Sequence, residues 1–160
     1  MRQRVADEII PKSVRHSRTK DGDEESNGAA LAIDLDLLTV AFSAPDEDGD
    51  TWLEVRLDGL HCIKKVLWYY YGGRIGNTRT CTYSGCSCSG GECNSFRLIV
   101  SSEETSTDGL PRSECKYGYT VTMLSIDPVK YTSFELRDLA ITGKQSGENE
   151  MITLRRKKKY

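Results

Sequence analysis

The sequence predicts an all-β domain with the architecture of a jelly-roll β-sandwich, and three observations carry this prediction. From Ala29 onward, short segments of β-branched and aromatic residues are separated by Gly, Pro, Asn and Asp. Some of these segments alternate between apolar and polar side chains, which is the period of a half-buried strand. No window longer than about ten residues keeps the period of an amphipathic helix. Several short strands at this spacing are typical of a sandwich or jelly roll.

Five segments have the character of strands. In the first, Thr51–Leu57, leucine and valine share one face while glutamate and arginine share the other, and Asp58-Gly59 then supplies a turn. The second is rich in aromatic residues, of which we expect Trp68 and Tyr70 in the core because strand side chains alternate. The expected strands after the first are Ile63–Tyr71, Phe96–Ser101, Tyr119–Leu124 and Ser133–Thr142.

The last of these segments changes phase. Phe134 and Leu136 have one parity, whereas Leu139 and Ile141 have the other. Because successive side chains point to opposite faces, the two pairs would face opposite sides of a regular strand. A bulge between them would restore a common inward face.

The two ends of the chain differ from its centre. Residues 1–28 are charged and lack apolar periodicity, so we expect a flexible leader, followed by a domain over residues 29–144. Residues 145–160 contain the run Arg155–Lys159 and predict a basic flexible tail. With a formal charge of -2, the chain lacks the net positive charge that would favour a nucleic-acid partner. The sequence contains no run of about 18 apolar residues, so it predicts no membrane span. The first residues do not resemble a signal peptide.

The chain contains six cysteines, an even number, and most of them lie in Thr/Ser/Gly-rich sequence. This distribution predicts long loops tied by disulfides, and therefore a secreted, extracellular protein. A zinc site is the alternative, but structural zinc sites usually contain two close pairs of ligands, and the chain has no Cys-x-x-Cys pair. The sequence leaves the pairing open among Cys62, Cys81, Cys86, Cys88, Cys93 and Cys115.

Three segments together resemble the galactose-binding-like jelly-roll superfamily, which includes fucolectins (F-type lectins) and discoidin or coagulation-factor F5/8 type C domains. Asn27–Asp36 resembles the opening Ala-x-Asp-Gly segment of that superfamily, Trp52–Leu57 its Trp-Trp-x-Val-Asp-Leu strand, and Arg137–Gly143 its closing strand. The chain departs from the pattern at Leu35, where the opening glycine would stand, and at Arg137, where fucolectins have a disulfide cysteine.

The resemblance implies a structural calcium ion where the opening loop meets the closing strand. Calcium takes six to eight oxygen ligands, and Asp34, Asp36 and Asp138 match the implied positions, with Thr39 as a further donor. The alternative is that Asp34 and Asp36 only cap or turn the backbone.

The resemblance does not extend to fucose. Fucolectins use a histidine from an early loop and two arginines around an Arg-x-Asp segment, but this chain has no histidine between Thr39 and Thr51 and no Arg-x-Asp after Tyr71. Aromatic faces with cationic or amide donors nevertheless suit a sugar, an anionic glycan or a protein epitope. The candidate ligand-binding residues are Arg74, Asn77, Arg79, Tyr83, Arg112 and Lys116.

The sequence favours a binding function over catalysis. The chain carries none of the common catalytic motifs, so we expect a binding module and no enzyme. The first hypothesis is an extracellular carbohydrate-binding or adhesion module with a glycan or an extracellular protein as its partner. The second is a matrix or structural interaction domain that has kept the fold and lost the sugar site.

Overall fold

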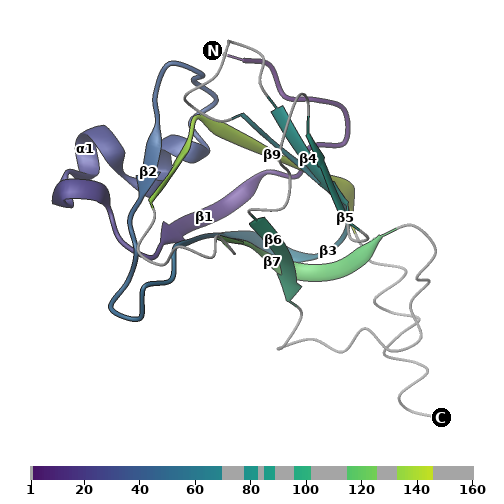
Figure 1. Ribbon diagram of the computed structural model, residues 1–160. Helices are drawn as coiled ribbons and strands as arrows, with labels where there is room; N and C mark the ends of the chain where they lie inside the picture. Colours follow the sequence, from purple (N-terminus) through teal and green to yellow (C-terminus); the bar gives the residue numbers. More distant parts are fainter. Residues whose placement is uncertain are drawn as a thin grey trace.

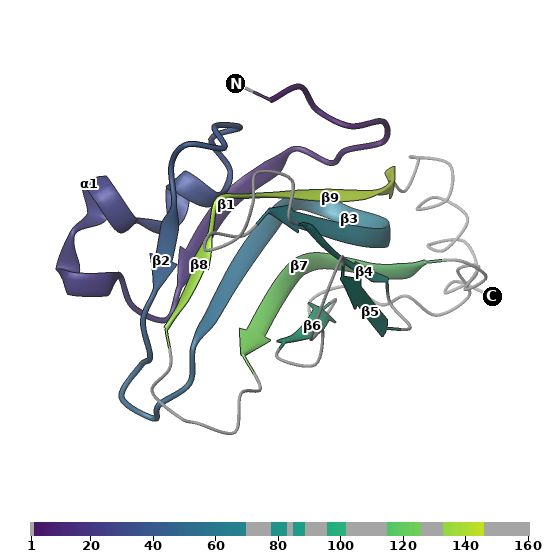
Figure 2. The same cartoon turned by 45° about the horizontal axis from the view of Figure 1, so that its top comes forward.

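The computed structural model describes residues 2–69, 78–82, 85–88, 96–101, 115–125 and 133–145. This part of the chain forms one seven-stranded and one two-stranded antiparallel sheet, as Figures 1 and 2 show. Helical structure within it is limited to α1 (Glu24–Asn27) and two 3-10 turns, Lys20–Gly22 and Ala29–Ala32. The all-β prediction is therefore confirmed. The strands are β1 (Pro11–His16), β2 (Ala41–Ser43), β3 (Trp52–Tyr69), β4 (Thr78–Thr82), β5 (Gly85–Cys88), β6 (Phe96–Ser101), β7 (Lys116–Ser125), β8 (Phe134–Leu136) and β9 (Asp138–Gln145).

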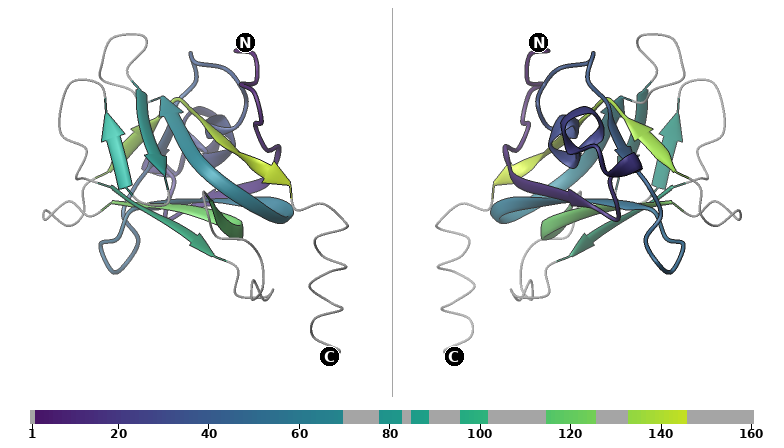
Figure 3. Two further views of the ribbon diagram at one scale, coloured as in Figure 1. Left: turned by 90° about the vertical axis from the view of Figure 1, so that its right-hand side faces the viewer. Right: turned by 90° about the vertical axis from the view of Figure 1, so that its left-hand side faces the viewer.

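Strand β3 is the spine of the larger sheet. Its first half pairs with β1 on one edge and β7 on the other, and its second half pairs with β9 and β4. The turn predicted at Asp58-Gly59 is wrong, because both residues lie inside β3. The register with β7 shifts between Arg56 and His61, so the turn residues instead produce a bend, which Figure 3 shows from the side.

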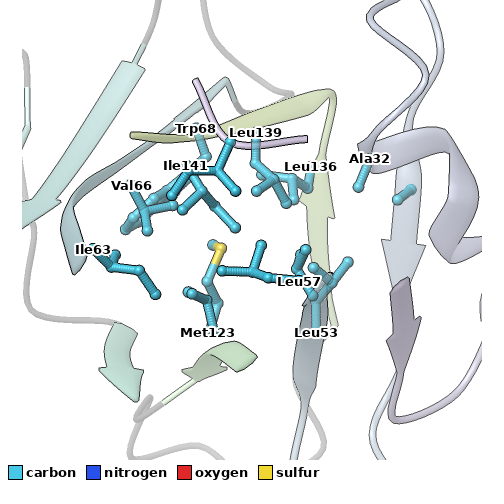
Figure 4. Close-up of a cluster of buried hydrophobic side chains, with 14 of the residues drawn as sticks. Ala32, Leu53, Leu57, Ile63, Val66, Trp68, Met123, Leu136, Leu139 and Ile141 are labelled. Carbon is cyan, nitrogen blue, oxygen red and sulfur yellow. The ribbon is translucent and has the colours of Figure 1, made fainter. Parts of the chain in front are cut away.

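The core lies on the inner face of this bent strand. The predicted alternation is confirmed, since Leu53, Val55 and Leu57 are buried while Arg56 is exposed. Trp68 is buried as expected. Figure 4 shows side chains from β3, β7, β8 and β9 pointing toward one another. The buried cluster includes Leu53, Val55, Leu57, Ile63, Val66, Val121, Met123, Leu136, Leu139 and Ile141.

The phase change near residue 137 marks a change of sheet. Phe134 and Leu136 belong to β8, which pairs with β2, whereas Leu139 and Ile141 belong to β9, which pairs with β3. The predicted bulge is therefore a break between two strands at Arg137. The expected consequence holds, because all four apolar residues join one core cluster.

The N-terminal segment is part of the folded domain, which corrects the flexible leader predicted for residues 1–28. Strand β1 covers an edge of β3, and the Ile9 N–H donates to the Ile141 carbonyl at 2.8 Å. The sequence misled because this segment buries little apolar surface beyond Ile9 and is held mainly by backbone pairing and buried charge. Residues 146–160 of the predicted tail lie outside the described residues.

One disulfide ties β3 to the start of β7. Cys62 and Cys115 are bonded with their Cα atoms 5.3 Å apart, and Tyr117 and Leu60 pack against them. The backbones of Cys81, Cys86 and Cys88 lie in β4 and β5, and their side chains, like all of Cys93, lie outside the description.

Candidate functional site

The region called here the loop pocket lies where three connections meet. The segment after β1 contributes Arg18 and Lys20, the β2–β3 connection contributes Asp46 and Glu47, and the residue before β8 contributes Ser133. The pocket has a volume of about 640 Å³, which is within the range of small-ligand sites.

Asp46 fixes the wall that the β2–β3 connection presents. Its carboxylate accepts the N–H groups of Asp48 and Asp50 at 3.0 and 2.9 Å, and the Trp52 indole N–H at 3.3 Å. The hydrogen bond from the Asp50 backbone, together with those from Trp52 and Asp48, lowers the pKa of Asp46. The pocket wall is therefore an ordered loop with an ionised carboxylate at its start.

The other charges of the loop pocket are largely uncommitted. Within the described residues, neither Arg18 nor Glu47 makes an ion pair or a side-chain hydrogen bond, and both are exposed. The Lys20 ammonium lies 3.9 Å from the centre of the Phe42 ring, a cation–π contact that orients it. Exposed donors thus face exposed acceptors across one cavity.

A partly buried chain of polar side chains adjoins the loop pocket at Thr19, which lines it. His16 Nε2 lies 2.7 Å from Thr19 Oγ1 and His16 Nδ1 lies 3.0 Å from Ser43 Oγ. The Thr19 hydroxyl donates to Glu24 at 2.5 Å, so neutral His16 donates from Nε2 to Thr19 and accepts from Ser43. Burial lowers the pKa of His16, although the Glu24 charge opposes this shift.

A second polar cluster, called here the junction cluster, consists of Arg2, Glu8 and Asp138. Arg2 Nε lies 2.6 Å from Asp138 Oδ2, and an Arg2 terminal nitrogen lies 2.8 Å from Glu8 Oε1. Burial raises the pKa of Asp138 against the effect of Arg2. Burial would also raise the pKa of Glu8, but hydrogen bonds from Arg2 and the Val5 backbone hold it below its ordinary value.

The described side chains do not fit the calcium site that the resemblance implies. Asp34 accepts the Asp36 N–H at 2.9 Å and the Thr39 hydroxyl at 2.5 Å, while Asp36 accepts the Leu38 N–H at 2.9 Å. These are the bonds of a self-contained turn, and Asp138 is already bound by Arg2. No group of three or more His, Cys, Asp or Glu residues in the described ranges is placed to hold a metal.

Of the ligand-binding residues predicted from sequence, only Arg79 and Lys116 lie in the described ranges. Lys116 is exposed in β7 and lies opposite Ile63 of β3. The backbone of Arg79 pairs with Trp68, while Arg74, Asn77, Tyr83 and Arg112 lie outside the described residues. The sequence pattern does not indicate the loop pocket, because it predicts a flexible leader where Arg18 and Lys20 lie.

A further cavity of about 550 Å³ lies at the bend of β3. Asp58, His61 and Lys64 line it together with Asp7 and Lys144. His61 is buried, and its Nε2 lies 2.7 Å from Asp58 Oδ1. This hydrogen bond lowers the pKa of Asp58.

Comparison with known proteins identifies the fold. No protein-family model and no curated protein matches the chain. A solved F5/8 type C domain from Bacteroides fragilis matches at 17% identity and a TM-score of 0.54, covering 88% of this chain and 99% of that one. A fucose-binding module from Streptococcus pneumoniae matches at 13% identity and a TM-score of 0.56, covering 86% and 98%.

The lectin domain of lectinolysin, solved in complex with Lewis B antigen, matches at 15% identity and a TM-score of 0.54, covering 87% of this chain and 98% of that domain. At these identities the likeness shows the fold alone. The chain therefore has the galactose-binding-like jelly-roll fold that the sequence predicts. None of the described helices is long and apolar enough to cross a membrane.

Proposed function

We propose that this chain is an extracellular, non-catalytic carbohydrate-binding module that holds its glycan in the loop pocket. The observation that carries the proposal is the meeting of uncommitted Arg18 and Glu47 with Lys20 and Asp46 in one cavity. The fold supports it, because similar structures include a fucose-binding module and a lectin domain bound to Lewis B antigen.

The chemistry of the loop pocket suits a polyhydroxylated ligand. Each sugar hydroxyl both donates and accepts, so it can bridge a carboxylate such as Glu47 and a cation such as Arg18. Asp46 is held by backbone and indole donors before any ligand arrives. A preordered wall loses less conformational entropy on binding, which favours affinity.

The disulfide supports the extracellular part of the proposal. Cys62 and Cys115 are separated by 53 residues, and disulfides persist in oxidising compartments. A glycan-binding module placed outside the cell would meet its ligand there. Free Cys62 and Cys115 thiols in natively sourced protein, measured by mass spectrometry under non-reducing conditions, would contradict this assignment.

A glycan array followed by titration calorimetry tests the proposal. Arg18→Ala is expected to weaken binding of an array-selected glycan at least about tenfold, because a charged hydrogen bond is lost. The matched control is Arg56→Ala, another exposed arginine, which lies 6.0 Å from the Tyr119 ring and outside the pocket. The Arg56→Ala variant should bind the glycan with the affinity of the unmodified chain.

The array also separates the alternatives. If Arg79→Ala abolishes binding while Arg18→Ala leaves it intact, the glycan lies at the candidate residues predicted from sequence and the loop pocket is the wrong site. If the chain binds no glycan on the array, the carbohydrate proposal fails and the protein-interaction alternative takes its place.

A further inference from the structure

Three segments that are far apart in the chain meet at Arg2. Its backbone N–H donates to the carbonyl of Leu35 in the opening loop at 2.7 Å. Its side chain donates to Asp138 at 2.6 Å and to the Leu139 carbonyl at 3.1 Å, both at the start of β9. One residue of the N-terminal arm thus fastens the opening loop to the closing strand.

The junction cluster concentrates negative charge away from water. The side chains of Glu8 and Asp138 are 2% and 0% exposed, and that of Arg2 is 6% exposed. Asp34 lies near enough for its charge to raise the pKa of Asp138 further. Buried carboxylates require a counter-charge, and Arg2 contacts two of them, assisted at Glu8 by the partly exposed Arg4 at 2.7 Å.

A divalent cation and the Arg2 guanidinium cannot both contact Asp138 Oδ2 at the same position. Calcium binds carboxylate oxygens at about 2.3–2.6 Å, which is the distance at which Arg2 Nε already contacts Asp138 Oδ2. A cation entering there would displace a like charge that is itself held by Glu8 and by two backbone carbonyls. The guanidinium supplies the positive charge, and Arg2 with its backbone N–H supplies the link between segments that a bridging ion would supply.

We propose that the guanidinium of Arg2 replaces a structural divalent cation at the junction of the opening loop and the closing strand. The chain is consequently stable without calcium, and it gains an affinity for calcium only when this guanidinium is removed. The freed ligands are oxygens of Asp138 and Glu8 together with the carbonyls of Gln3 and Leu139. The inference does not depend on whether the loop pocket binds a glycan.

Thermal melting tests the inference directly. The unmodified chain should melt at the same temperature in millimolar calcium chloride and in EDTA, because a ligand raises the melting temperature only if it binds the native state. Arg2→Met should melt about 10 °C lower, since it leaves buried carboxylates without their partner. The control Arg15→Met removes an arginine that is 69% exposed and lies outside the junction cluster, and it should melt close to the unmodified chain.

The response to calcium separates a replaced cation from an ordinary structural contact. Calcium should raise the melting temperature of Arg2→Met and leave the unmodified chain unchanged. A rise in the unmodified chain, or no rise in Arg2→Met, would overturn the proposal.

If Arg2→Met fails to fold even with calcium, the double variant Arg2→Met/Asp138→Asn decides. Removing the Asp138 charge as well should restore part of the lost melting temperature, because Glu8 still keeps its contact with Arg4, and should leave no response to calcium. A double variant that is as unstable as Arg2→Met alone, or that responds to calcium, would contradict the assigned role.

Discussion

The junction cluster and the loop pocket use the same residue types in opposite ways. At the junction, Arg2 and two carboxylates are buried and bonded to one another. In the loop pocket, Arg18 and Glu47 are exposed, and neither has an ion-pair partner among the described residues. Burial with a partner makes a charge part of the fold, whereas exposure without one leaves it available to a ligand. Sequence alone could not separate the two arginines, because both lie in the same charged N-terminal stretch.

The largest difference between the two regions is expected in stability. Asp138→Ala leaves Arg2 buried without one of its partners and should lower the free energy of unfolding by about 3–5 kcal/mol. Glu47→Ala, in the loop pocket, should change it by less than about 0.5 kcal/mol. Urea unfolding with an unchanged m-value measures both. Equal losses in the two variants would remove the distinction between a charge that serves the fold and one that serves a ligand.

The next largest effect is expected in binding. Asp46→Ala removes the acceptor that orders the wall of the loop pocket, so glycan affinity should fall about tenfold. The control Asp46→Asn keeps a side-chain oxygen that can accept the Asp48 and Asp50 N–H groups and should retain most of the affinity. Isothermal titration calorimetry measures both. If Asp46→Asn lost as much as Asp46→Ala, the carboxylate charge would be the important feature and not the ordered loop.

The sequence predicts features that depend on neighbouring residues better than it predicts contacts between residues far apart in the chain. The Trp52–Leu57 alternation gives the buried face correctly, because strand side chains have a fixed period of two. The parity change after Leu136 also has a local signature, although it marks a change of sheet instead of a bulge. The Arg2–Asp138 pair joins residues 136 positions apart, and no local pattern indicates it.

The same reasoning explains the missed site. Arg18 and Lys20 meet Asp46 because β1 pairs with β3 and the Ala44 N–H donates to the Arg18 carbonyl at 2.8 Å. Composition does not reveal these backbone contacts. His16 was placed in the leader for the same reason. The resemblance to fucolectins predicts the fold, but it implies calcium at Asp138, where the chain has placed a guanidinium instead.

His16 provides a pH-dependent test of the polar chain that adjoins the loop pocket. Burial lowers its pKa in the folded chain relative to about 6.5 in the unfolded chain. The unfolded state therefore binds the proton more readily, so the stabilisation is complete above pH 6.5 and is lost as the pH falls through the folded pKa. His16→Gln should lack this part of the pH dependence. Urea midpoints across that interval measure it, and parallel profiles for the two proteins would show that His16 does not contribute.

A small effect is expected at Arg15, which is intermediate between Arg2 and Arg18 because it is exposed and yet has a partner. Its side chain is 69% exposed, pairs with Glu54 at 2.8 Å and lies 5.1 Å from the Trp52 ring. Exposed ion pairs contribute little, so Arg15→Ala should lower the free energy of unfolding by less than about 1 kcal/mol. Salt screens exposed charges far more than buried ones, so this loss should shrink at about 1 M sodium chloride while the loss in Arg2→Met persists. A salt-sensitive loss in Arg2→Met would mean that water reaches the junction, and the contrast between a buried and an exposed arginine would then be one of degree.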